Sequence, residues 1–137
     1  MEYLVDHLYS EIKMAEISLE KAVIAKVRQA SLNIIDDLQS EIDLLCFWLS
    51  HYYGKKYTPK IMPDHLEMLE SMDNLDGLEF ETLYLEKMAD HDRELVHLVE
   101  KVNISEFRND FQEMLNTIIS EQADEIHMFN QLLKIRV

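Results

Sequence analysis

The sequence contains few residues that interrupt or cross-link a chain. Its 137 residues include one cysteine, two glycines and two prolines. A single cysteine excludes an internal disulfide, so folding must depend on a hydrophobic core, and 47% of the residues are hydrophobic. A β-rich protein of this length would need many more glycines and prolines at its turns. The composition therefore predicts an all-α fold built from long helices.

Basic residues are also scarce, with 13 lysines and arginines against 27 acidic residues and a formal charge of −14. A surface of this sign repels phosphate backbones, so nucleic acid is not expected as a partner. Cations or a basic protein patch suit it better, although solubility alone is the simpler explanation of the charge. No apolar run approaches the roughly 20 residues of a membrane span. No signal peptide is predicted, because charges begin at Glu2, and an intracellular protein is expected.

Residues n and n+84 match along the chain without a gap. The matches fall at helical spacing and share one offset, which chance would not produce, so we interpret them as an internal duplication. They include Asp6-His7 with Asp90-His91, Glu16 with Glu100, Ile34-Ile35 with Ile118-Ile119, Glu41-Ile42 with Glu125-Ile126, and Leu49 with Leu133.

Each repeated unit is predicted to form a helical hairpin. Apolar residues recur at steps of three and four, as on a helix face that packs against a partner. One such stripe predicted to face the core consists of Tyr84, Met88, His91, Leu95, Leu98 and Val102. The predicted helices cover residues 2–22, 25–52, 79–102 and 105–134, with turns within 20–26 and 103–110.

These helices predict one domain over residues 1–137, a ferritin-like four-helix bundle. Hairpins at 1–53 and 79–137 are joined by a long crossover at 54–78, a connection known in bundle topologies. The crossover holds both prolines and both glycines, and Asp64 can begin a short helix that runs to about Asp73.

Four repeat-related polar residues are candidates for chemistry: His7, Glu41, His91 and Glu125. In antiparallel hairpins, each histidine is predicted to lie beside the glutamate of its own unit. Polar groups on a core face must be hydrogen-bonded or bind metal, because an unsatisfied one costs about 1–3 kcal/mol. A His–Glu hydrogen bond inside each hairpin satisfies both groups. A metal site is the alternative, and imidazole with carboxylate suits zinc, iron or copper.

A second candidate site is chemically soft. Met62, His65, Met68 and Met72 recur at steps of three and four and would share one helix face. Thioether and imidazole ligands favour Cu(I). Methionine also fills irregular gaps in a core, which is the simpler interpretation of the same pattern.

The sequence does not predict an enzyme. A di-iron oxidase needs two Glu-x-x-His motifs, but only Glu94 and His97 form one, while Ser10 and Lys13 stand at the corresponding positions of the first unit. No glycine-rich phosphate loop or Cys-x-x-Cys motif occurs. Cys46 lies in an apolar helical run and is expected to be a buried, unreactive thiol.

The repeated pattern resembles the ferritin-like domain-of-unknown-function family 305, which includes copper-binding bundle proteins. In the first unit the resemblance rests on Tyr3 to His7, Ile12, Met14-Ala15, Ile34-Ile35, Glu41-Ile42 and Trp48-Leu49. In the second it rests on Tyr84-Leu85, Met88, His91, Ile118-Ile119, Gln122, Glu125-Ile126 and Leu133.

The resemblance implies a metal site, with copper as the ion, and adds Met14 and Gln122 to the candidate ligands His7, Glu41, His91 and Glu125. The chain departs from the family pattern where Leu8 and Asp92 replace a second histidine. The expected function is thus non-enzymatic copper-type binding, altered relative to the family. The alternative is a metal-free bundle that binds another protein or forms a homo-oligomer.

Overall fold

The computed structural model describes residues 1–135, with residue 104 described by its backbone only. The helices are α1 (Glu2–Lys21), α2 (Ala25–Tyr53), α3 (Pro63–Asp73), α4 (Gly77–Glu100) and α5 (Asn109–Ile135), with a 3-10 turn, η1 (Ile104–Glu106), before α5. No strand occurs in this part of the chain, so the predicted all-α fold is confirmed. The arrangement as a four-helix bundle of two repeated hairpins stays a prediction.

The chain forms two compact units, Met1–Tyr84 and Leu85–Val137, called here the first and second units. The first contains α1, α2, α3 and the beginning of α4. The second contains the rest of α4 and α5. Within the described residues, no helix combines the length and apolarity that a membrane crossing requires.

Helix boundaries follow local backbone chemistry. α1 ends at Lys21 because Ala22 is extended, at φ −64° and ψ 132°, which places the first turn inside the predicted range. α2 ends where Gly54 adopts the left-handed region at φ 62°, a conformation that costs glycine little. Pro63 opens α3 at a position where its missing N–H is no loss.

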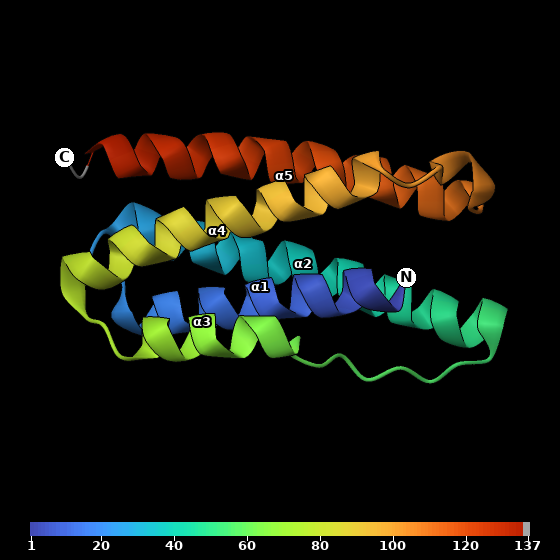
Figure 1. Ribbon diagram of the computed structural model, residues 1–137, viewed down its shortest axis with the longest axis horizontal. Coiled ribbons are helices and arrows are strands. Elements are labelled where there is room, and N and C mark those ends of the chain that lie inside the picture. Colours follow the sequence, from blue (N-terminus) through green and yellow to red (C-terminus); the bar gives the residue numbers. More distant parts are fainter. Residues whose placement is uncertain (136–137) are drawn as a thin grey trace. The chain divides into compact units, whose positions relative to one another are not determined.

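In the first unit, α1 and α2 run antiparallel and α3 runs beside α1, as Figure 1 shows. Their shared core consists of aliphatic, aromatic and methionine side chains. The buried residues of this core are Leu4, Val5, Leu8, Ile12, Met14, Val27, Ile34, Leu38, Ile42, Leu45, Met72, Phe80 and Tyr84.

Two buried polar contacts join the start of α4 to the first hairpin. The Tyr84 hydroxyl lies 2.7 Å from Ser31 Oγ, which lies 2.8 Å from Ser18 Oγ. The backbone N–H of Ile24 donates to Glu81 Oε1 at 3.0 Å. Ile24 precedes α2, so Glu81 satisfies a donor that the helix end leaves open.

The second unit is a hairpin of α4 and α5. Arg93 of α4 donates to Asn130 of α5 at 3.4 Å, which links the two helices on their exposed side. The core residues are Leu85, Met88, Ala89, Leu95, Phe111, Leu115, Ile118, Phe129 and Leu132. The predicted core positions of Leu98 and Val102 are wrong, because both side chains are exposed where α4 ends and the turn begins.

Candidate metal centre

The first unit contains a buried pair of histidines that comes from two different helices. His7 of α1 is fully buried and His65 of α3 is 5% exposed. Their ring centroids are 5.8 Å apart and the rings meet at 74°. A ring nitrogen of His7 and a ring nitrogen of His65 lie within 4.8 Å of each other. Two ligand atoms of one metal ion are at most about 4 Å apart. A small side-chain adjustment therefore brings both imidazoles into reach of one ion.

His7 also stacks with an aromatic ring of its own helix. The Tyr3 ring, one turn earlier on α1, lies 6.0 Å from that of His7 at an interplanar angle of 27°. Stacking and burial restrict the orientation of the imidazole before any ligand arrives, and such preorganisation favours binding.

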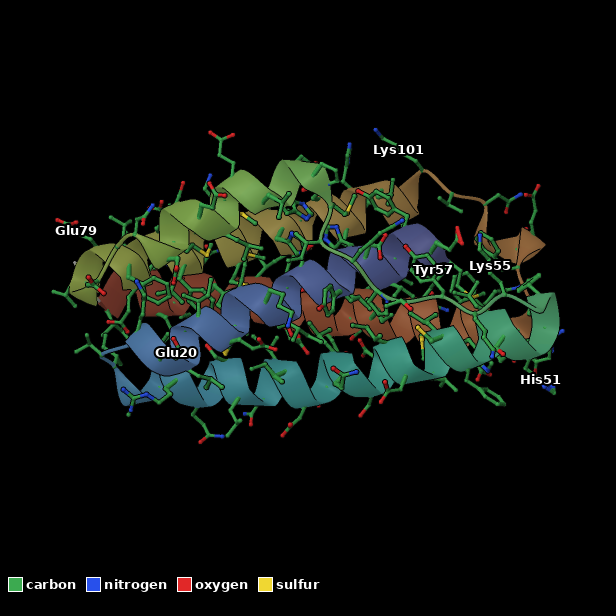
Figure 2. The ribbon with its side chains drawn as sticks, turned by 90° about the horizontal axis from the view of Figure 1, so that it is seen from below. Glu20, His51, Lys55, Tyr57, Glu79 and Lys101 are labelled. Atoms are coloured by element: carbon green, nitrogen blue, oxygen red, sulfur yellow. The ribbon has the colours of Figure 1, made fainter. Side chains whose placement is uncertain are left out.

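The linker segment 54–62 is fastened to α1 next to His7. The Tyr57 hydroxyl donates to Asp6 Oδ2 at 2.5 Å, and the backbone N–H of Lys60 donates to Asp6 Oδ1 at 3.0 Å. Lys55 forms an ion pair with Glu2. Figure 2 shows Lys55 and Tyr57 over the first turns of α1. Burial and the Asp6 carboxylate together raise the pKa of the Tyr57 hydroxyl well above its usual range.

The other end of α3 is also held by α1. Lys21 Nζ donates to the carbonyl oxygens of Asp73 and Leu75, the latter at 2.7 Å, and lies 3.4 Å from an Asp76 oxygen. A cation at these carbonyls complements the negative end of the α3 dipole. Because contacts to α1 flank α3 on both sides, His65 has a defined position relative to His7.

Three residues of the predicted soft cluster, His65, Met68 and Met72, share the inward face of α3, and Met62 immediately precedes this helix. His65 and Met72 are buried, and Met62 and Met68 are half-buried. Met68 lies one turn after His65, so their side chains are helical neighbours. Met14 of α1 is fully buried two turns after His7. Glu41 is buried on α2. That it lies beside His7 stays a prediction.

The second unit gathers buried polar groups of a different kind. His91 of α4 and Gln122 of α5 are 3% and 1% exposed, and Glu125 is half-buried one turn after Gln122. Asp92 is fully buried, and one of its oxygens lies within 4.8 Å of a Glu125 oxygen. Two carboxylates at this distance repel each other unless a proton or a cation lies between them.

Sequence reasoning missed two residues of these centres, Asp6 and Asp92, and the pairing of His65 with His7. Asp6 matched Asp90 in the repeat, but its role as the acceptor for the linker segment had no local signal. Asp92 lies four residues after Met88 and three before Leu95, so the helical stripe could have shown that it is buried. Nothing in the spacing indicated that His65 meets His7, because the two histidines belonged to separate predicted sites.

The expectation of a buried Cys46 is wrong, since its side chain is half-buried on α2. Partial burial, with Asp43 and Asp6 nearby, raises the pKa of its thiol. A raised pKa leaves little reactive thiolate near neutral pH, which agrees with the expected low reactivity.

The sequence profile of the family described as Domain of unknown function (DUF305) matches residues 1–133. The chain belongs to this family. A comparison with curated protein sequences gave no match.

Solved structures of other family members have the same fold. CopM in its Cu(II)-bound form is 21% identical, with a TM-score of 0.86 over 99% of this chain and 94% of CopM. CopM in its Cu(I)-bound form is 22% identical, with a TM-score of 0.84 over 97% and 91%. A DUF305 protein of Streptomyces coelicolor, described as secreted, is 20% identical, with a TM-score of 0.81 over 98% and 90%. Because this relative is described as secreted, the expectation of an intracellular protein has no support.

Proposed function

We propose that this protein binds a soft transition-metal ion, best represented by Cu(I), through the imidazoles of His7 and His65. The observation that carries the proposal is the buried histidine pair, whose ring nitrogens lie within 4.8 Å of each other. Imidazoles on preorganised helices, with methionines at helical spacing, form a donor set suited to Cu(I). The copper-bound forms of CopM, a protein of the same family, support copper as the ion.

The methionine thioethers are the proposed additional ligands. Met62 and Met68 flank His65 by one turn on each side, and Met14 lies two turns along α1 from His7. His91 occupies the repeat position of His7 and is a further candidate, together with Gln122 and Glu125 of the same unit and Glu41 of α2. The role of the protein would be storage, buffering or delivery of the ion, without catalytic turnover.

Copper titration tests the proposal directly. Metal-free protein is titrated with Cu(I) against a chromophoric chelator, and bound copper is counted by elemental analysis. We expect one tightly held Cu(I) per chain and an X-ray absorption spectrum with nitrogen and sulfur scatterers. His7→Leu should abolish this binding, while His127→Leu, at an exposed position on α5, is the matched control.

Retained Cu(I) affinity in His7→Leu would contradict the proposal, provided circular dichroism shows an unchanged helix content. His91→Leu then decides whether the second unit contributes. A fall in affinity adds His91 to the ligands, whereas no change assigns it to internal hydrogen bonding.

A second candidate function is metal-free binding of another protein or a second copy. The observation that favours it is the exposure of large side chains near the end of α2, where Phe47 is 56% and Tyr53 is 60% exposed. Sedimentation of the metal-free protein at several concentrations distinguishes self-association from a monomer. A monomer that binds Cu(I) tightly favours the first function.

A further inference from the structure

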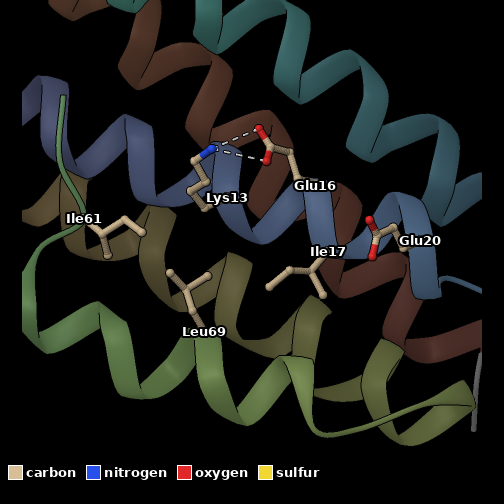
Figure 3. Close-up of a pocket in the computed structure, with 6 residues that line it drawn as sticks. All are labelled: Lys13, Glu16, Ile17, Glu20, Ile61 and Leu69. Atoms are coloured by element: carbon tan, nitrogen blue, oxygen red, sulfur yellow. Dashed lines mark hydrogen bonds and ion pairs between the residues drawn. The ribbon is translucent and has the colours of Figure 1, made fainter. Parts of the chain in front are cut away.

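A groove in the first unit is lined by residues other than the histidine pair and differs from that pair in chemistry. Its volume is about 270 Å³. It combines a charged wall on α1 with aliphatic side chains from α1, the linker segment and α3. The lining residues are Lys13, Glu16, Ile17, Glu20, Ile61 and Leu69. Figure 3 shows the three aliphatic side chains between α1 and α3, with the charged groups along α1.

Two of the three charges in the groove neutralise each other. Lys13 Nζ lies 3.3 Å from Glu16 Oε2 and 5.0 Å from the centre of the Tyr9 ring. Burial alone would lower the pKa of Lys13, but the Glu16 carboxylate and Tyr9 raise it above its usual value. Lys13 is therefore a fixed cation that already has its anion.

Glu20 is the charge that remains. It is exposed in the last turn of α1, and no ion pair or hydrogen bond of its side chain occurs among the described residues. Glu20 lies one turn after Glu16, so its carboxylate stands at one end of the groove beside Ile17. The lining thus carries a net charge of one negative unit.

We propose that this groove binds a small aliphatic ammonium ion. The alkyl chain would lie on Ile17, Ile61 and Leu69, and the ammonium group would pair with Glu20. Aliphatic side chains offer no ligand to a bare metal ion, and an uncharged hydrocarbon would leave the carboxylate unused. A net charge of −14 also raises the local concentration of organic cations.

The occupant is a free small molecule and not a side chain of a partner protein. A stable protein interface buries about 800 Å² on each partner. A groove of about 270 Å³ lined by six residues is below that scale and matches the small end of ligand sites. The proposal does not depend on copper binding.

The test uses the full chain, freed of metal and kept in a chelator, with hexylammonium as the probe. Titration is followed by ¹H–¹⁵N NMR, against hexan-1-ol and hexanoate as probes of the same chain length. We expect saturable shifts confined to the lining residues, with a dissociation constant on the order of 1 mM for a ligand of this size. Hexan-1-ol should bind at least about 10-fold more weakly, and hexanoate should cause no saturable shift.

Glu20→Gln is the matched variant, since it keeps the size of an exposed side chain and removes the charge. In this variant hexylammonium should bind no better than hexan-1-ol. Glu86→Gln, at an exposed position on α4 that does not line the groove, should leave the affinity unchanged. Equal binding of alcohol and ammonium by the unaltered protein, an unchanged affinity in Glu20→Gln, or no saturable shift would each overturn the proposal.

Discussion

The two units contain polar centres of different chemistry. In the first, an imidazole pair and the methionine face of α3 meet at α1. In the second, an oxygen of the buried Asp92 carboxylate lies within 4.8 Å of a Glu125 oxygen. One centre offers nitrogen and sulfur and the other offers mainly oxygen, so they suit soft and hard ions respectively.

This difference arises from few positions. Leu8 of the first unit corresponds to Asp92 of the second, and Leu38 corresponds to Gln122. His65 lies in the predicted crossover, outside the predicted repeat. The predicted repeat thus differs between its units at these positions and in the presence of α3.

The largest expected effect is on Cu(I) binding by the imidazole pair of the first unit. His65→Leu should lower Cu(I) affinity at least about 100-fold, because it removes one of the two proposed nitrogen ligands. Chelator competition measures the change. An affinity within a factor of two of the unaltered protein would show that the pair is not the binding site.

The methionine face gives the next largest effect. Met68→Leu keeps the side-chain volume and removes the thioether, so Cu(I) affinity should fall by about 10-fold while Zn(II) affinity stays unchanged. Competition titrations with both ions measure this ratio. Met128→Leu on α5 provides the control, and an equal loss for both ions would show that packing, not sulfur ligation, is responsible.

Removing a carboxylate of the second unit is expected to change the stability of the fold. Asp92→Asn replaces one of two carboxylates that lie close together, and the free energy of unfolding at neutral pH should rise by about 1 kcal/mol because their mutual repulsion is lost. Urea unfolding measures it, with Asp90→Asn at the neighbouring exposed position as the control. A decrease in stability would show that the other interactions of the Asp92 carboxylate outweigh this repulsion.

The smallest effect concerns the attachment of the linker segment. Tyr57→Phe removes the hydrogen bond to Asp6 and should lower the free energy of unfolding by about 1 kcal/mol, since the bond is partly exposed. Tyr53→Phe, at an exposed position on α2, should change nothing.

Because of the Tyr57–Asp6 hydrogen bond, the free energy of unfolding is expected to depend on pH in the alkaline range. The Tyr57 pKa is raised in the folded protein, so its stabilising contribution is complete below the ordinary tyrosine value of about 10 and is lost as pH rises beyond it. Urea unfolding between neutral pH and pH values above about 10 should show this loss in the unaltered protein and a smaller one in Tyr57→Phe. Identical profiles would show that Tyr57 does not titrate with folding.

Local patterns were enough to predict most of the helical structure. The stripes at three- and four-residue spacing gave α1, α2, α4 and α5, and Asp64 with the prolines gave α3 close to its observed bounds. The start of α5 was placed four residues too early, at 105 instead of Asn109, because capping residues occur on both sides of η1. Burial of His91 also followed from its stripe, since helix periodicity depends only on neighbours in sequence.

The sequence by itself determined the all-α class, the helices, the buried histidines and the family. Only the tertiary structure decided which buried groups meet. His65 reaches His7 because Asp6 fixes the linker segment at one end of α3 and Lys21 holds the carbonyls at the other, over separations of more than 50 residues. Helix periodicity states which face of a helix is buried, but the register between two helices depends on the packing of many side chains and on the path of the linker. That packing, and not any local motif, places one imidazole against the other.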